Sequence, residues 1–373
     1  NWAGSGQHPA SGQPLLANDP HVSIQIPSIW YEVGLHAPGW NVVGFSFAGV
    51  PGVIIGHNDK IAWGVTNTGP DVQDLYVEKI NPANPLQYEF EGEWRDMQVV
   101  QEVIKVNGGE DVVLDVRLTQ HGPIINDVVD GLSDVLALRW TAQEPSRVLQ
   151  SVILLDQAQN FDDFRKALEY WDTPSQNFVY ADTEGNIGYQ MPGLVPIRQK
   201  GDGLLPVPGW TGEYEWNGWV PYDELPRLYN PPEGYIVTAN HAVVDPQYPH
   251  MIELKWDNGD RGQRIDDMIK EAIAQGKVTA EDFARIHFDS KSLLAESYLP
   301  LLASLSSSDG KVQAAIDRLA AWDLQERRDS VGAALFEIFF MHLTQAVLAD
   351  ELGADNVTSD KVFFHQLAQQ PGA

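Results

Sequence analysis

A change of pattern near residue 261 is the feature that most constrains how this chain can fold. Over residues 42–240, short runs of β-branched and aromatic residues alternate with Gly, Asn, Asp and Pro turn signals, which predicts many short strands. After Arg261, apolar residues recur with helical periodicity, and N-cap residues precede several of the runs. We therefore predict an α+β protein, with a β-rich part at residues 1–260 and a helical part at residues 261–373.

The same signals predict individual elements. Two hairpins are expected, with strands at 53–55 and 61–66 around a turn at 56–60, and with strands at 177–181 and 187–189 around a turn at 182–186. An isolated helix is expected at 161–171, with Asn160 as its N-cap. The helical part is expected to contain helices at 265–274, 279–286, 292–305, 311–322, 331–349 and 359–369.

Charge and composition exclude several classes of function. The chain has 24 Lys and Arg against 52 Asp and Glu, a formal net charge of −28. Such a field repels nucleic-acid phosphates and anionic lipid, so neither a nucleic acid nor a membrane surface is an expected partner. The sequence contains no cysteine, which removes disulfides, thiolate nucleophiles and cysteine-based zinc sites and fits either an exported bacterial protein or a thermophilic one. Its ten histidines form no HExxH motif, so each is interpreted as a structural or surface residue.

The most apolar stretch, residues 331–348, is not expected to cross a membrane. It is interrupted by polar side chains at Glu337, His342, Thr344 and Gln345. A membrane span needs about 20 predominantly apolar residues. We therefore predict a buried helix here.

Two kinds of catalytic site can be weighed from the residues alone. Residues 44–48, Gly-Phe-Ser-Phe-Ala, resemble a nucleophile elbow, but a turn and a strand follow instead of the helix that this motif requires, so Ser46 is expected in a strand or loop. Paired carboxylates beside tryptophans would suit a glycoside hydrolase. The candidates are Glu213, Glu215 and Asp223, near Trp210, Trp216 and Trp219. With 52 acidic residues such proximity also arises by chance.

Five short motifs are more specific. In chain order they are LANDPH at 16–21, PGVIIGHN at 51–58, AWGVTN at 62–67, YIVTAN at 235–240 and DRGQRI at 260–265. Together they resemble the large (β) subunit of the penicillin acylase family of N-terminal nucleophile hydrolases, which includes penicillin, cephalosporin and acyl-homoserine-lactone acylases. The resemblance extends from Asn1 to about residue 265, and more loosely through the helices.

This resemblance implies an αββα sandwich with a helical C-terminal region, and a mature large subunit that begins Ser-Asn-x-Trp after autocatalytic cleavage of a precursor. The x-Trp pair is Asn1-Trp2 here, so the nucleophilic serine is expected two residues before Asn1, outside this sequence. An α-amine, which titrates near pH ~7.7–8.0, can take the proton of the serine hydroxyl. The internal Ser5 has no such amine, and Trp2 is a candidate anchor for this end. Both ends of the chain are expected to be incomplete, and a small α subunit from the same precursor is the expected partner.

The resemblance also implies roles for four polar residues. The backbone N–H of Asn67 and the side-chain amide of Asn240 are expected to donate to the oxyanion of the reaction. His21 is expected to hold the α-amine and the substrate. Arg261 is expected to lower the pKa of the amine and to orient Asn240.

Two further sites are expected. An apolar acyl pocket is expected at Val22, Ile24, Ile55 and Val65. The small side chain of Val22 stands where many relatives carry an aromatic, which leaves room for long or bulky acyl groups. A structural calcium ion is expected on the carboxylates of Asp71 and Asp74 and the carbonyls of Gln73 and Pro206.

The predicted function is therefore hydrolysis of a linear non-peptide amide, of the penicillin, cephalosporin or N-acyl-homoserine-lactone type, in the periplasm or outside the cell. The reaction would pass through an acyl-enzyme and would need no organic cofactor. Two alternatives stay open. A glycoside hydrolase would lose activity on acid-to-amide changes and would not depend on its N-terminus, whereas a catalytically silent binding relative would accept no covalent label.

Overall fold

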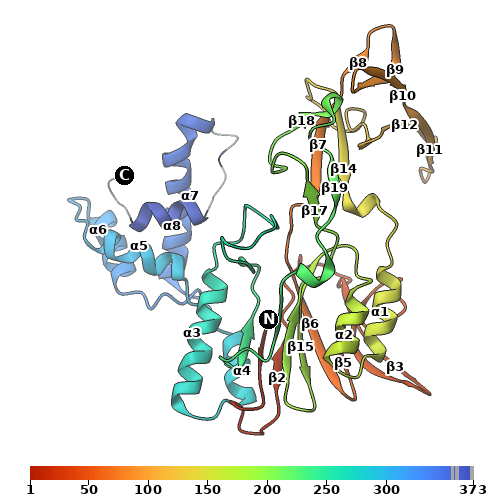
Figure 1. Ribbon diagram of the computed structural model, residues 1–373. Coiled ribbons are helices and arrows are strands. Elements are labelled where there is room, and N and C mark those ends of the chain that lie inside the picture. Colours follow the sequence, from red (N-terminus) through yellow and green to blue (C-terminus); the bar gives the residue numbers. More distant parts are fainter. Residues whose placement is uncertain (354–356, 358–360, 370–373) are drawn as a thin grey trace.

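The computed structural model describes residues 1–353, 357 and 361–369, and its central part is built of four stacked layers (Figure 1). Helices α1 (Val148–Gln157) and α2 (Phe161–Leu168) form the first layer, and α3 (Asp260–Gln275) and α4 (Ala280–His287) form the last. Two sheets lie between them. The α+β class and the αββα order expected from the sequence are thus confirmed.

The two sheets differ in size. The larger has seven antiparallel strands in the order β20-β16-β15-β6-β5-β4-β3, and the smaller has the order β2-β1-β21. The strands of the larger sheet are β3 (Trp30–Ala37), β4 (Trp40–Phe47), β5 (Ile55–Asn58), β6 (Ile61–Asn67), β15 (Gln176–Asp182), β16 (Ile187–Gln190) and β20 (Arg227–Tyr229). Those of the smaller sheet are β1 (Trp2–Gly4), β2 (Leu15–Ala17) and β21 (Tyr235–Val237).

A core of buried side chains fills each interface between layers. Phe164 of α2 packs with Phe178 of β15 between the first helices and the larger sheet. Ala3 and Val179 lie between the two sheets, and Trp2 packs against α3 and α4 on the other face of the smaller sheet. Because the larger sheet is covered on both faces, β15 is buried at every position and does not alternate apolar with polar exposure.

An arm of short strands extends from the larger sheet and is seen at the upper right of Figure 1. It contains three three-stranded sheets and one two-stranded sheet. Its strands are β7 (Gln73–Val77), β8 (Ile80–Asn81), β9 (Asn84–Phe90), β10 (Glu93–Asp96), β11 (Gln98–Ile104), β12 (Val112–Thr119), β13 (Gly122–Pro123), β14 (Leu136–Trp140), β17 (Pro196–Arg198), β18 (Val207–Pro208) and β19 (Trp216–Trp219).

The last helices form a separate core. They are α5 (Leu293–Ala303), α6 (Gly310–Ala320), α7 (Val331–Leu352) and α8 (Lys361–Gln369). Phe336 and Phe340 of α7 are buried in it, but Ile338 and Met341 are more than half exposed. The prediction that this stretch is a buried helix is therefore correct for only one of its faces. Within the described residues, α7 is the one helix whose length and composition alone would let it cross a membrane.

Several local predictions are confirmed and others are corrected. Asn160 caps α2, its Oδ1 accepting the Asp163 N–H at 2.9 Å, and Ser46 lies in β4 as expected. The first hairpin turns later than predicted, because Asn58 Oδ1 accepts the N–H groups of Lys60 and Ile61 and the chain reverses there. Helix α1 was not predicted, since its apolar residues are consecutive rather than periodic. The predicted start of the last helix, 359, lies outside the described residues.

Candidate active site

Strand β1 lies at the centre of the smaller sheet and leads to the site. It pairs with β2 on one side and β21 on the other, which sets Trp2 opposite both Ala17 and Val237. The amine of Asn1 donates to the Thr238 carbonyl at 2.7 Å, and the Thr238 N–H donates to the Asn1 carbonyl at 2.8 Å. Asn1 is buried. This end of the strand is therefore held as firmly as the interior of a sheet.

Asn18 joins β1 to the larger sheet. Its Oδ1 accepts from Asn1 Nδ2 at 2.7 Å and from the Val65 N–H at 2.9 Å. In return, Asn1 Oδ1 accepts the Asp19 N–H at 2.9 Å. Gly64 makes room for this junction, because a Cβ there would lie only 2.5 Å from Asn18 Oδ1. The LANDPH and AWGVTN motifs therefore meet at Asn1.

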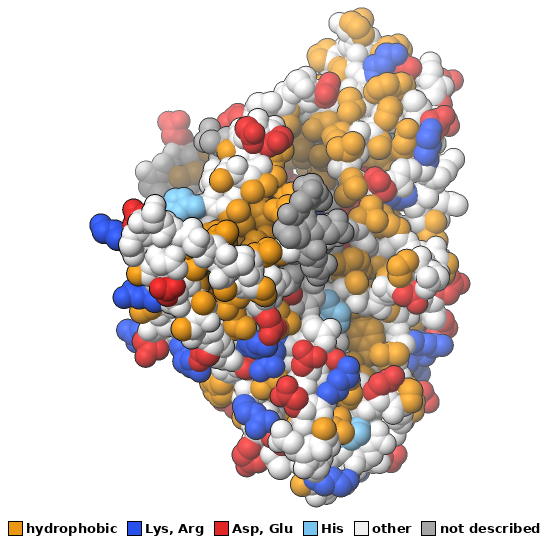
Figure 2. Space-filling model, turned by 90° about the vertical axis from the view of Figure 1, so that its left-hand side faces the viewer, with side chains coloured by type: hydrophobic (Ala, Val, Ile, Leu, Met, Phe, Trp, Pro, Cys, Tyr) orange, Lys and Arg blue, Asp and Glu red, His pale blue; other side chains and the backbone are white. Residues whose placement is uncertain are grey.

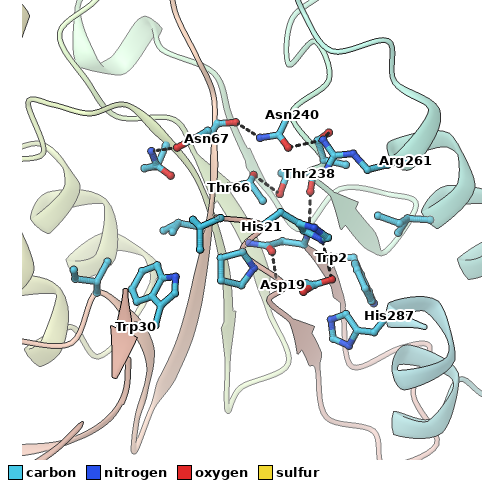
Figure 3. A pocket seen from close by; sticks show the side chains of 18 of the residues that line it. Trp2, Asp19, His21, Trp30, Thr66, Asn67, Thr238, Asn240, Arg261 and His287 are labelled. Atoms are coloured by element: carbon cyan, nitrogen blue, oxygen red, sulfur yellow. Dashed lines mark hydrogen bonds and ion pairs between the residues drawn. The ribbon is translucent and has the colours of Figure 1, made fainter. Parts of the chain in front are cut away.

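A second network joins the ends of β6, β21 and α3 (Figure 3). Asn240 Nδ2 donates to the Asn67 carbonyl at 2.8 Å, and Arg261 Nη2 donates to Asn240 Oδ1 at 2.7 Å and to the Ala239 carbonyl at 3.2 Å. Gln176 Nε2 donates to Asn67 Oδ1 at 2.7 Å. The Asn240 amide has two N–H donors, and Asn67 uses one. The backbone of Asn240 has φ 65°, in the left-handed region that Asn tolerates better than most residues.

Both networks line one cavity of about 980 Å³ between the layers. Its wall is polar on one side and apolar on the other. The polar side includes Asn1, His21, Asn67, Asn240 and Arg261. The apolar side includes Trp30, Phe47, Val50, Ile54, Val152 and Trp171. A ligand could therefore bury an apolar group while its polar end meets the amide donors.

The electrostatic environment at the end of β1 disfavours positive charge. Burial lowers the pKa of His287, whose ring lies 4.5 Å from that of Trp2. Groups that must act as neutral bases are favoured here.

The Penicillin amidase family model matches residues 1–372 of the chain. The chain belongs to the penicillin amidase family. It is 31% identical to the acyl-homoserine lactone acylase QuiP of Pseudomonas aeruginosa over 389 residues, which cover 97% of this chain and 46% of that protein. It is 32% identical to the penicillin acylase 2 proenzyme of Pseudomonas sp. SE83, with 94% of this chain and 45% of that protein covered. The chain thus spans less than half the length of these relatives.

A solved penicillin amidase has the same fold. The thermostable penicillin G acylase of Alcaligenes faecalis superposes with a TM-score of 0.80 at 28% identity, covering 94% of this chain and 64% of that one. The family resemblance inferred from the five motifs is therefore confirmed, together with the fold that it implied.

The structure brings together most of the site residues expected from the penicillin amidase resemblance. His21, Asn67, Asn240 and Arg261 all line the cavity, and so do Val22 and Val65. His21 is largely exposed and its Nε2 lies 3.2 Å from Asp19 Oδ2. Two of the four residues expected in the acyl pocket lie elsewhere. Ile24 is fully exposed, and Ile55 is largely buried in β5 and lines a separate hollow.

The expected calcium ligands do not form an open metal site in this chain. Asp71 and Asp74 lie together, but the Arg198 guanidinium lies between them, with Nη2 at 3.1 Å from Asp71 Oδ1 and 2.9 Å from Asp74 Oδ1. No group of three or more acidic or histidine side chains in the described part of the chain has the arrangement of a metal site. The donor atoms that calcium would need are engaged by an arginine.

The carboxylates considered for a glycoside hydrolase do not face one another across the cavity. Each is engaged by a cationic or imidazole partner, and none lines the cavity. The pairs are Glu213 with Lys200, Glu215 with His121, and Asp223 with Arg165. The geometry therefore gives the glycosidase alternative no support.

Sequence reasoning missed the residues that join the segments of the site. Asn18 belongs to a motif that was recognised, but no role was assigned to it. Thr66 Oγ1 donates to Thr238 Oγ1 at 3.1 Å, and Gln176 holds Asn67 from β15. Only the pairing of distant strands shows these contacts, because each residue alone resembles an ordinary strand or turn residue.

Proposed function

We propose that the protein containing this chain hydrolyses linear non-peptide amides through an acyl-enzyme on an N-terminal serine two residues before Asn1. The observation that carries the proposal is the register of β1. Asn1 pairs with Thr238 and Asn18, so two further residues in the same register would bring the serine opposite Asn240, beside His21. The serine would then lie at the polar side of the cavity.

The residues of the chain supply the remaining chemistry. The serine hydroxyl attacks the amide carbon, its proton passes to the α-amine, and the carbonyl oxygen becomes an oxyanion. The second N–H of the Asn240 amide and the backbone N–H of Asn67 would stabilise that oxyanion. The protonated amine then gives its proton to the leaving nitrogen, and water hydrolyses the acyl-serine. Arg261 holds the Asn240 amide in place for this role.

The acyl group would occupy the apolar side of the cavity. Trp30 and Phe47 lie there with their ring centroids 4.1 Å apart, and Val152 and Trp171 line the same side. Val22 presents a small side chain at the entrance. This lining suits an arylacetyl or long acyl chain better than a polar one, as the names of the relatives, acyl-homoserine lactone acylase and penicillin acylase, also suggest.

A second subunit from the same precursor is the proposed partner. The chain matches less than half of each relative, and it exposes apolar side chains that a partner would cover. Ile24 and Ile26 are fully exposed, and Val103 and Val113 of the β11–β12 hairpin are about half exposed. Hydrophobic side chains also gather on the arm at the top of Figure 2. We also propose that the protein is exported to the periplasm or outside the cell.

The test uses the natural precursor. The mature large subunit is isolated, its mass and N-terminal sequence are measured, and it is treated with a fluorophosphonate probe, which labels activated serines. We expect a first residue of Ser and a label on that residue alone, with no label after Ser→Ala substitution there. A large subunit that begins at Asn1, or a label that survives the substitution, would overturn the mechanism.

A further inference from the structure

A buried ion cluster at the base of the arm lies where the calcium ligands were expected. It joins the segment that follows β6 to strand β17. The Arg198 Nε lies 3.1 and 3.0 Å from the two oxygens of Asp74, and its Nη2 lies 2.9 Å from Asp74 Oδ1, which is a bidentate contact. The same Nη2 also donates to the carbonyl of Asp71 at 3.2 Å and pairs with its carboxylate.

The cluster is largely buried, with Arg198 Nη1 left without a hydrogen-bond partner among the described residues and the charge of Glu253 also acting on Asp71. The side chains of Arg198 and Asp74 are about 5% exposed or less, and that of Asp71 is 16% exposed. Trp216 Nε1 donates to Asp74 Oδ2 at 2.5 Å. Gly203, at φ 81°, covers the group, because a Cβ there would lie within 2.7 Å of Asp71, Arg198 and Asp74 side-chain atoms.

A calcium ion and this guanidinium compete for the same oxygens. Calcium needs six to eight oxygen ligands at about 2.3–2.6 Å, whereas a guanidinium satisfies two carboxylates through planar N–H donors. Both Asp74 oxygens already accept two donors each, from Arg198 and Trp216. A divalent ion bound to both carboxylates would also lie within a few ångström of a fixed positive charge, and that repulsion is strong in a buried site.

We propose that Arg198 is the resident cation of this site, and that it makes the fold around Asn67 independent of calcium. The covalently attached guanidinium holds Asp71, four residues after Asn67, to Asp74 at the start of β7. The Asp71 N–H also donates to the Ile252 carbonyl at 2.8 Å, so the ion cluster ties the oxyanion segment to the loop before α3. A charge that cannot dissociate replaces an ion that can.

The first experiment measures calcium in the natural, processed protein. After gel filtration in calcium-free buffer, calcium content is determined by elemental analysis, and the melting temperature is measured with a chelator and with millimolar calcium chloride. We expect far less than one calcium per molecule and the same melting temperature in both buffers. Equimolar bound calcium, or a melting temperature that the chelator lowers, would overturn the proposal whether or not the protein is an amidase.

The second experiment uses the variant Arg198→Gln, which leaves two facing carboxylates without a cation. We expect its melting temperature to fall by at least about 5 °C in chelator and to recover partly in calcium. The matched control is Arg147→Gln, because Arg147 pairs with one buried carboxylate, that of Asp172, and not with two. This variant should lose stability and should not recover in calcium. Recovery of both variants, or of neither, would contradict a site built from the two carboxylates. If Arg198→Gln does not fold, Arg198→Lys, which keeps a cation, is measured: its melting temperature should be the same in chelator and in calcium, and a melting temperature that calcium raises would overturn the proposal.

Discussion

Replacing Asn240 separates its backbone role from its chemical role. The residue combines a left-handed backbone, φ 65°, with a side-chain amide held between the Asn67 carbonyl and the Arg261 guanidinium. Asn240→Ala removes the amide and also forces a Cβ-bearing residue without local hydrogen bonds into the left-handed region. Asn240→Gly removes the amide but accepts that backbone freely. Both variants therefore lose the side-chain amide, but only Asn240→Ala also places an unsuited residue in the left-handed region.

The two losses have different magnitudes. An oxyanion donor is worth about 2.7–4 kcal/mol of transition-state stabilisation, so both variants should lose ~10²–10³ in kcat. The left-handed backbone costs a non-glycine residue roughly 1–2 kcal/mol. The stability of Asn240→Ala should therefore fall by that strain plus the two lost hydrogen bonds, about 2–4 kcal/mol in all. Asn240→Gly should lose only the hydrogen-bond part.

The assay compares kcat and melting temperature in the processed protein. Turnover is followed with a chromogenic phenylacetyl or long-chain acyl anilide, and unfolding is followed by circular dichroism. We expect two inactive variants, of which the glycine variant is the more stable. A glycine variant that keeps kcat within about threefold of the parent would remove Asn240 from the oxyanion site. Equal stability of the two variants would refute the strain assigned to its backbone.

Three further substitutions test the site and the packing around it. Arg261→Gln breaks the 2.7 Å contact to the Asn240 side chain and should lower kcat by about tenfold with little change in KM. Gly64→Ala drives a Cβ into Asn18 and should cost about 1–3 kcal/mol of stability, whereas Gly310→Ala, where nothing lies within 4 Å, should be neutral in the same denaturation assay. Burial raises the pKa of Asp156 to about 7. Its folded pKa exceeds its unfolded one, so stability is lost as pH rises from about 4 through 7, and Asp156→Asn should melt higher than the parent at pH ~8 but not at pH ~4.

The layers of the fold could be predicted because local patterns encode them. Helical periodicity and N-caps located α3 to α7, and capped α2 was recognised from Asn160. Helix α1 was missed because its apolar residues come in consecutive runs rather than at helical spacing. Hairpin β5–β6 was predicted with the wrong turn, since Gly56 resembles a turn residue but lies opposite Gly44 in the sheet, where a Cβ would clash with Val43.

The site could be predicted only through the family resemblance, and only in part. Asn67, Asn240 and Arg261 are far apart in sequence, and their contacts depend on β6 and β21 ending, and α3 beginning, at the same edge. No local sequence pattern indicates that these distant elements meet at one edge. The metal ligands illustrate the limit of motif transfer. Asp71 and Asp74 match the expected pattern, but the residue that decides their partner, Arg198, lies more than a hundred positions away.

The register of β1, on which the position of the proposed nucleophile would depend, is constrained by packing some distance from the cavity. Side chains alternate along β1, so Trp2 points to α3 and α4 while Ala3 points between the two sheets. The space at Ala3 is fully buried and holds only a methyl group, and an indole cannot enter it. A one-residue slip of β1 would exchange these two side chains, and is therefore forbidden. By excluding this slip, the large apolar side chain of Trp2 helps to fix how the strand enters the cavity, although it makes no contact with a reacting group.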